Sequence, residues 1–256
     1  MLTNAVREAG ALAMSFFGRG LTGTHKPDNT PVSEADLAVD RLLHERLTAT
    51  RPSYGWLSEE SADNPHRLDA ARVWIVDPID GTRAFLAALA EWTIAAALVE
   101  DGEPVLGVVF NPATAEMYTA RRGSGAFLNG VRITVPRRGE IEGSRLIVTK
   151  GFFKHKVWSE PWPPVDRVWV NSIAYRLALI AAGRADATLS LSAKSEWDLA
   201  AAALLVQEAG GKITDAAGAA LSFNQPTPRI EGLVAASPAL HDLLIERTKT
   251  VVAKHN

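Results

Sequence analysis

The chain has 256 residues, of which 47% are hydrophobic and 22% are charged, and its formal net charge is −2. This composition is typical of a globular protein and excludes a disordered chain, and the small net charge argues against a broad nucleic-acid-binding surface. The absence of cysteine excludes disulfides, thiolate metal sites and cysteine nucleophiles. Because the first residues lack a signal pattern and no apolar run approaches about 18 residues, we expect a cytoplasmic protein with no membrane partner.

Helical patterns come first along the chain, and strand patterns follow. Residues 3–18 and Glu34–Ala49 have apolar side chains at helical spacing, which predicts two helices near the N-terminus. Val73–Val76 is a short β-branched run typical of a buried strand. From residue 93 to residue 110, apolar β-branched runs flank the turn signal Asp101-Gly102, which predicts an antiparallel meander.

The second half alternates short strands with helices. The expected strands lie at 146–149, 168–170, 187–191 and 232–236, and the expected helices at 173–182, 196–209 and 238–252. This alternation predicts an α/β protein. Gly151–Val165, with two tryptophans and three prolines, is the least regular stretch, and it could be either a lid or a packed loop.

The run Asp77-Pro78-Ile79-Asp80-Gly81-Thr82 places two carboxylates directly after the strand Val73–Val76. The proline keeps the first aspartate extended, at the end of the strand. The glycine permits a sharp turn, and the threonine is a good N-cap for an apolar helix over 83–90. Backbone N–H groups and a positive helix end then lie beside two acids, which favours a metal and phosphate site over a plain capped turn.

Other acids could complete this site. Glu59-Glu60 follows Ser58, and two further aspartates lie in the patterns Ser33-x-x-Asp36 and Ser195-x-x-Asp198. Each has a simpler explanation, because both patterns fit the capping box, in which the acid only bonds the first N–H groups of a helix. Glu59 and Glu60 taken alone could be surface acids.

In combination these segments resemble a known family. The run Asp77–Thr82, the segment Glu59-Glu60-Ser61, and Trp197-Asp198-x-Ala-Ala followed by Glu208-Ala209-Gly210-Gly211 are similar to the inositol monophosphatase superfamily of Mg²⁺-dependent, lithium-sensitive phosphomonoesterases. The resemblance implies a layered α/β/α/β/α sandwich. It also implies an N-terminal α+β half over 1–143 with most metal ligands and a C-terminal α/β half over 144–256 that contributes Asp198. Because the family often forms dimers, the resemblance also implies a homodimer.

The resemblance further implies roles for individual residues. The metal ligands for two or three Mg²⁺ ions would be Glu59, Asp77, the Ile79 carbonyl, Asp80 and Asp198. Such hard oxygen ligands suit Mg²⁺. Asp36 would assist a further metal and hold the Thr82 hydroxyl, while Glu59 and Thr82 would take or relay the proton of an attacking water. The phosphate would be bound by the amides of Gly81 and Thr82, beside Asp80 and Asp198.

The substrate would be a small phosphate ester, and the nucleotidase branch fits best. Arg83 after Thr82 is similar to the lysine of the 3'(2'),5'-bisphosphate nucleotidases and of the related histidinol-phosphate phosphatases, whereas many inositol monophosphatases read Asp-Gly-Thr-Thr-Asn-Phe. Arg83 could meet a second phosphate or be a solvated arginine in the first helical turn. Further nucleotidase-like segments are Lys26–Val32, Glu91–Ile94 and Glu196.

Two departures leave the substrate open. Ala84 stands where nucleotidases usually carry an acid, and Asn171-Ser172 replaces the usual Gly-Ser. The order of candidates is therefore 3'-phosphoadenosine 5'-phosphate, then inositol 1-phosphate, then histidinol phosphate. The non-enzyme alternative is a metal- or phosphate-binding regulatory module, and the retained Glu59 and Thr82 argue against it.

Overall fold

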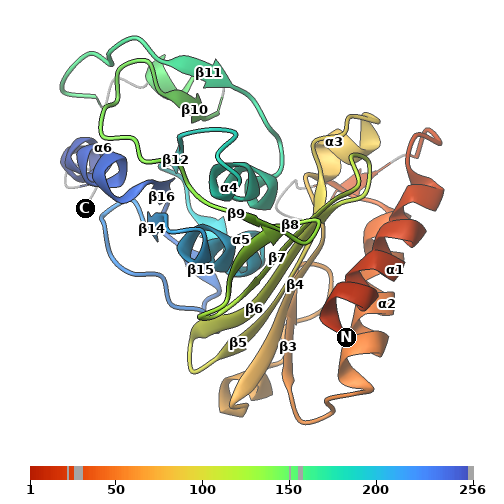
Figure 1. Ribbon diagram of the computed structural model, residues 1–256. Helices are drawn as coiled ribbons and strands as arrows, with labels where there is room; N and C mark the ends of the chain where they lie inside the picture. Colours follow the sequence, from red (N-terminus) through yellow and green to blue (C-terminus); the bar gives the residue numbers. More distant parts are fainter. Residues whose placement is uncertain (22, 26–30, 150, 155–157, 253–256) are drawn as a thin grey trace.

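Layers of helices and sheets alternate in the computed structural model, which describes all residues except 22, 26–30, 150, 155–157 and 253–256 (Figure 1). Helices α1 (Leu2–Phe16) and α2 (Glu34–Thr48) cover one face of a seven-stranded sheet. Its other face packs against α4 (Ile173–Ala181) and α5 (Glu196–Glu208), beyond which lie a five-stranded sheet and α6 (Pro238–Val252). The layered α/β/α/β/α sandwich expected from the sequence is confirmed.

The seven-stranded sheet follows the chain order. Its strands are β3 (Gly55–Ser58), β4 (Arg72–Asp80), β5 (Thr93–Glu100), β6 (Glu103–Asn111), β7 (Glu116–Arg121), β8 (Gly125–Leu128) and β9 (Val131–Ile133). β3 runs parallel to β4, and all later neighbours are antiparallel, so the predicted meander is confirmed. Between β5 and β6, Asp101 and Gly102 have φ angles of 51° and 78°, the conformation that a two-residue hairpin turn requires.

The five-stranded sheet is mixed. Its order is β11 (Asp166–Val168), β10 (Arg145–Ile147), β12 (Ala187–Ser190), β16 (Leu233–Ala236) and β14 (Lys212–Thr214). The strand expected at 168–170 thus lies two residues earlier. The remaining elements are the pairs β1 (Thr24–His25) with β2 (Pro31–Val32) and β13 (Lys194–Ser195) with β15 (Arg229–Ile230), the short helix α3 (Thr82–Leu86), and the 3₁₀ turns η1 (Pro65–Asp69) and η2 (Phe152–Lys154).

Small side chains let α5 lie close to the large sheet. Ala200–Ala203 are buried, and a Cβ added to Gly107 of β6 would lie only 2.5 Å from the carbonyl oxygen of Ala201. One apolar cluster joins α4 and α5 to both large sheets. Because this cluster contains residues from both sides of residue 143, the division of the chain into two halves at that residue stays a proposal. None of the described helices is both long and apolar enough to cross a bilayer.

The described part of Gly151–Val165 packs as an aromatic cluster. Phe152 is buried and its ring contacts those of Trp158 and Trp162, while the indole N–H of Trp158 donates to the Phe152 carbonyl at 2.9 Å. Arg247 of α6 lies over the Trp162 ring. These contacts correspond to a packed loop, the second of the two alternatives.

Candidate active site

Asp77 and Asp80 reach the same side of β4 because the strand contains a β-bulge. The sequence pattern ends this strand at Val76, whereas β4 continues to Asp80. Asp77 pairs with Ala95 and Asp80 with Thr93, so three steps along β4 face two along β5. Side chains three residues apart point to opposite faces of a regular strand, and the extra residue turns both carboxylates to one side.

The turn after β4 differs from the prediction. The sequence pattern places Thr82 at the N-cap of a helix over 83–90, but the N-cap is Gly81 and α3 is shorter, beginning at Thr82 itself. Gly81 has a φ of 96°, and an added Cβ would lie 2.8 Å from a carbonyl oxygen, so glycine is required. The Thr82 hydroxyl lies 3.1 Å from the Ile79 carbonyl oxygen and 3.3 Å from Asp36 Oδ1. It therefore bonds site residues instead of capping the helix.

Asp36 and Asp198 act in helix caps and also face the site. Both predicted capping boxes form. Oδ2 of Asp36 accepts from the Ser33 N–H at 2.8 Å, and Oδ2 of Asp198 accepts from the Ser195 N–H at 3.2 Å. In each case the cap uses one carboxylate oxygen. The capping explanation and a role in the site are therefore compatible.

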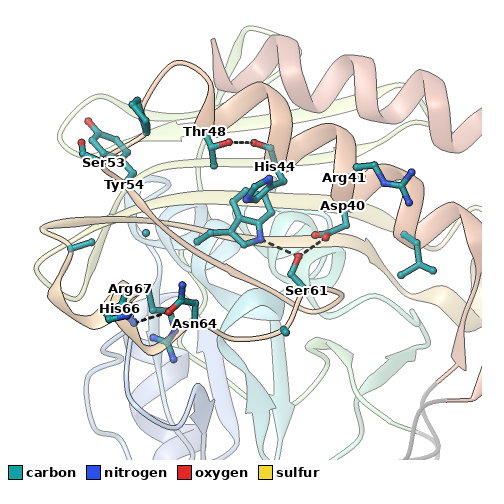
Figure 2. A pocket seen from close by; sticks show the side chains of 16 residues that line it. Asp40, Arg41, His44, Thr48, Ser53, Tyr54, Ser61, Asn64, His66 and Arg67 are labelled. Carbon is teal, nitrogen blue, oxygen red and sulfur yellow. Dashed lines mark hydrogen bonds between the residues drawn. The ribbon is translucent and has the colours of Figure 1, made fainter.

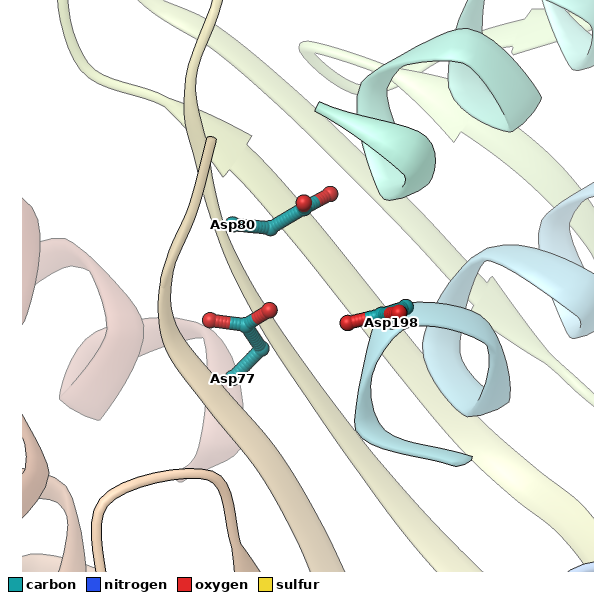
Figure 3. A group of neighbouring side chains, drawn as sticks. All are labelled: Asp77, Asp80 and Asp198. Atoms are coloured by element: carbon teal, nitrogen blue, oxygen red, sulfur yellow. The ribbon is translucent and has the colours of Figure 1, made fainter. Parts of the chain in front are cut away.

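Asp77, Asp80 and Asp198 converge, although they come from β4 and from the distant helix α5. One ligand atom from each of them lies within 4.8 Å of the others (Figure 3). Asp80 Oδ2 accepts from the Ser172 hydroxyl at 2.6 Å and from the Ala174 N–H at 2.5 Å. Asp77 is 1% exposed, and neither of its carboxylate oxygens has a hydrogen-bond partner among the described residues. A buried carboxylate without donors is costly unless a cation neutralises it, so this oxygen donor set fits a divalent metal ion.

Burial and mutual repulsion perturb these acids in the metal-free protein. Desolvation raises the pKa of Asp77 and of Asp198 well above the usual range, and neighbouring carboxylates raise both further. Desolvation also raises the pKa of Asp80 to about 6, against the lowering effect of its hydrogen bonds. The charge of Glu59 contributes to all three shifts, which places Glu59 electrostatically beside the triad.

A cavity of about 580 Å³ contains the converging acids. Every candidate site residue except Asp36 lines it: Glu59, Asp77, Ile79, Asp80, Gly81, Thr82, Arg83 and Asp198. Asp36 is buried and reaches the site through its contact with Thr82. The structure thus brings together the whole set that the sequence singled out.

Sequence reasoning missed the basic wall of the same cavity. Arg176, Lys194 and Arg229 line it together with Arg83. Arg176 is 3% exposed; its Nε donates to the Val170 carbonyl at 2.7 Å, and its Nη1 is buried without a hydrogen-bond partner among the described residues. Arg176 is the only charged residue in the apolar helix Ile173–Ala181, and this isolated charge was the available signal.

The segments that resemble nucleotidases contribute unequally. Glu91 accepts a hydrogen bond at 2.8 Å from the amide group of Asn171, and Asn171 lines the cavity. Glu196 is fully buried and instead accepts the backbone N–H groups of Asn224 and Gln225, which ties a loop to α5. Lys26–Thr30 lies outside the described residues.

Comparisons with known proteins agree with this geometry. The family model described as "Inositol monophosphatase family" matches residues 1–253. The chain is 36% identical to a histidinol-phosphatase of Chlorobaculum parvum, over 93% of this chain and 91% of the relative, and 37% identical to an inositol-1-monophosphatase of Rhizobium meliloti, over 85% of both. It is 32% identical to a 3'(2'),5'-bisphosphate nucleotidase of Aggregatibacter actinomycetemcomitans, over 86% of this chain and 84% of the relative.

Solved structures agree as well. An IMPase of Thermotoga maritima superposes with a TM-score of 0.85 at 29% identity, covering 99% of this chain and 97% of the other. The family consists of metal-dependent phosphoric monoester hydrolases, and the acidic triad provides a place where a metal ion could bind. The chain therefore belongs to the inositol monophosphatase family and is a phosphatase of that family.

Proposed function

We propose that this phosphatase hydrolyses a small phosphate monoester with Mg²⁺ held by Glu59, Asp77, the Ile79 carbonyl, Asp80 and Asp198. The observation that carries the proposal is the buried Asp77 carboxylate, which has no donor among the described residues and faces two further carboxylates. Hard oxygen ligands around a cavity open to substrate suit Mg²⁺, which commonly takes phosphate oxygens as further ligands.

The chain's own groups would position the reactants. When bound, about two or three Mg²⁺ ions would stabilise the charge on the attacking and leaving oxygens of the phosphoryl group. Glu59 would accept a proton from the attacking water, with the Thr82 hydroxyl as a relay toward Asp36. Water then adds to phosphorus as the ester oxygen leaves with a proton, giving an alcohol and inorganic phosphate.

The phosphate would lie above the turn between β4 and α3. Gly81, Thr82, Asp80 and Asp198 all line the cavity, and the N–H groups of Gly81 and Thr82 would bind the phosphate. Arg83 is exposed at the same edge. It can contribute a guanidinium to an incoming anion.

A nucleotide bisphosphate, 3'-phosphoadenosine 5'-phosphate, is the favoured substrate because the cavity has a basic wall. Arg176 and Lys194 both line the cavity, and Nη1 of Arg176 is buried without a hydrogen-bond partner among the described residues. Burial lowers the pKa of Lys194, whose ammonium group donates to Ser192 and Ala193. A buried guanidinium group is costly without an anionic partner. A second phosphate on the substrate would supply that partner.

Two other esters remain candidates. Relatives named histidinol-phosphatase and inositol-1-monophosphatase are 36% and 37% identical to this chain, against 32% for the nucleotidase. The indole of Trp169 also lines the cavity, with Arg176 at 5.8 Å from its ring centre, and it could contact an adenine or an imidazole. We therefore keep inositol 1-phosphate second and histidinol phosphate third.

Phosphate release from the three esters, measured in parallel with and without Mg²⁺, tests the proposal. We expect release only with Mg²⁺, a preference for 3'-phosphoadenosine 5'-phosphate, and loss of turnover in Asp77→Asn. No release from any ester by protein that binds Mg²⁺ would favour the regulatory module.

Arg176 has its own test. Adenosine 3'-phosphate lacks only the 5'-phosphate, so the ratio of kcat/KM for the bisphosphate to that for adenosine 3'-phosphate isolates the second phosphate. We expect Arg176→Met to reduce this ratio about tenfold or more, since a charge-assisted hydrogen bond contributes about 1.5–3 kcal/mol. Arg176→Lys should keep part of the ratio, and the exposed Arg145→Met should leave it unchanged. An unchanged ratio in Arg176→Met would refute the assignment.

Three further properties are proposed on the family resemblance: inhibition by Li⁺, a homodimer and a cytoplasmic location. The cysteine-free composition is compatible with a reducing compartment. Sedimentation of the purified protein tests the dimer, and phosphate release at increasing LiCl tests the inhibition.

A further inference from the structure

A second cavity, of about 760 Å³, lies between α2 and the segment that follows β3 (Figure 2). Asp40 is in its wall, on α2 and one turn after Asp36. Asp40 is 8% exposed, and both of its carboxylate oxygens are occupied. Oδ1 accepts from the Ser58 hydroxyl at 2.5 Å, and Oδ2 accepts from the Ser61 hydroxyl at 2.5 Å. One carboxylate therefore holds both ends of a four-residue segment, Ser58–Ser61.

Both serine hydroxyls have a second hydrogen-bond partner besides Asp40. The Ser61 oxygen accepts the indole N–H of Trp56 at 3.2 Å, and the Ser58 oxygen accepts the Glu60 N–H at 3.4 Å. Each hydroxyl has one proton, and because a carboxylate oxygen accepts hydrogen bonds, that proton points to Asp40 while the hydroxyl oxygen accepts its other partner. The ring of His44 packs edge-on against Trp56 at 4.9 Å and fixes the indole in turn.

The segment clamped in this way carries Glu59. Its backbone N–H donates to the Val76 carbonyl at 3.3 Å, which holds the residue beside β4. Beyond that point the chain leaves the sheet, and Asp40 supplies the bonds on both sides of the Glu59-Glu60 pair. The clamp therefore restricts where the Glu59 carboxylate can lie relative to Asp77.

We propose that Asp40 is a positioning residue for the active site: it acts through Ser58 and Ser61 to set the place of Glu59. The same helix reaches Thr82 through Asp36, one turn earlier. Residues four apart lie on one face of a helix, so α2 fixes the distance between the two groups that handle the proton of the attacking water. This inference rests on the proposed role of Glu59 in metal binding and proton transfer.

Three substitutions and two measurements test the proposal. Asp40→Asn and Ser61→Ala each break one side of the clamp, and Ser61→Thr restores the hydroxyl. Partners that orient metal ligands typically change metal affinity or activity by about 10–100-fold. We expect Asp40→Asn and Ser61→Ala to weaken Mg²⁺ binding in calorimetry and to lower kcat, each about tenfold, with KM for the ester within about twofold.

The controls separate positioning from general stability. Asp215 also accepts two hydrogen bonds, from the N–H groups of Ala217 and Ala219, but in a turn outside the site, so Asp215→Asn is the matched change. We expect it to leave Mg²⁺ affinity and kcat within about twofold. Ser61→Thr should recover both quantities, which a loss of folded protein would not explain. If Asp40→Asn does not fold, Ser61→Ala and Ser58→Ala carry the test.

The outcomes are distinguishable. Unchanged Mg²⁺ affinity and kcat in folded Asp40→Asn and Ser61→Ala would overturn the proposal, as would equal losses in Asp215→Asn. Protein that binds Mg²⁺ but releases phosphate from no ester would overturn the proposed function, and the calorimetric comparison would still decide on the clamp. Absence of Mg²⁺ binding by the unchanged protein would overturn both.

Discussion

Replacing Asp77 by asparagine should stabilise the metal-free protein and abolish its response to Mg²⁺. In the metal-free fold the Asp77 carboxylate is buried, and its oxygens have no hydrogen-bond partner among the described residues. Burial and the neighbouring acids raise its pKa, so the folded state opposes its charge. Asparagine has nearly the same shape without that charge. Without metal, the fold should therefore be more stable with asparagine than with the aspartate that we propose to bind the metal.

The magnitude follows from the separation of the acids. Two unit charges at the 4.8 Å that bounds the triad repel by about 3 kcal/mol at an effective dielectric constant of about 20. The carboxylate can take up a proton instead, which limits the cost, and we expect a gain of about 1–2 kcal/mol near neutral pH. Such a gain raises Tm by about 2–8 °C. In the unchanged protein, Mg²⁺ at about 100 times its Kd should add about 2.7 kcal/mol.

Thermal unfolding with EDTA and with saturating Mg²⁺ decides the matter. Asp77→Asn should melt above the unchanged protein in EDTA and below it in Mg²⁺, so the order inverts. Asp166→Asn, an exposed change on β11, should leave both melting temperatures and the Mg²⁺ response nearly unchanged. If Asp77→Asn melts lower in EDTA, the carboxylate stabilises the fold by itself and the reasoning from its missing partners is wrong.

Three further outcomes are expected. Because the pKa of Asp80 rises to about 6 on folding, the folded state keeps a proton that the unfolded chain loses near pH 4. The free energy of unfolding of the metal-free protein, measured with urea, should therefore fall from about pH 4 to 7. With Mg²⁺ bound, this fall should be smaller. Thr82→Val, which removes the hydroxyl near Asp36, should lower kcat about 100-fold, and Thr82→Ser should restore most of it. Glu208→Ala removes the acceptor of the Gly123 and Gly125 N–H groups and should cost about 1–3 kcal/mol in unfolding without changing kcat.

The sequence predicted the elements because those signals are local, whereas the resemblance to the family predicted which acids converge. The Asp-Gly turn, the capping boxes and the pattern of apolar residues each depend on a few neighbouring residues. Thr82 was assigned the wrong position because threonine is a good N-cap in general, whereas here Gly81 adopts the left-handed conformation and occupies that position. The bulge in β4 was not predicted either, since it depends on the register against β5.

The basic wall and the Asp40 clamp depend on tertiary structure. Arg176 faces the acids only after α4 packs beside the end of β4, and one charge on an apolar helix does not say which cavity it will line. Asp40 lies four residues after Asp36, and sequence spacing gives the shared face of the helix but not the two serines that bond it. Contacts between distant segments were therefore beyond the sequence patterns.

The acids of the site differ in how far the fold supports them without metal. Asp80 has donors from Ser172 and Ala174, and Asp36 and Asp198 each give one oxygen to a helix cap. Asp77 has none among the described residues. The supported carboxylates are held in place before a cation arrives, so little of the binding energy is needed to order them. The unsupported Asp77 adds the repulsion that a cation relieves. Mg²⁺ affinity should therefore depend most on charge at Asp77 and on placement at Glu59.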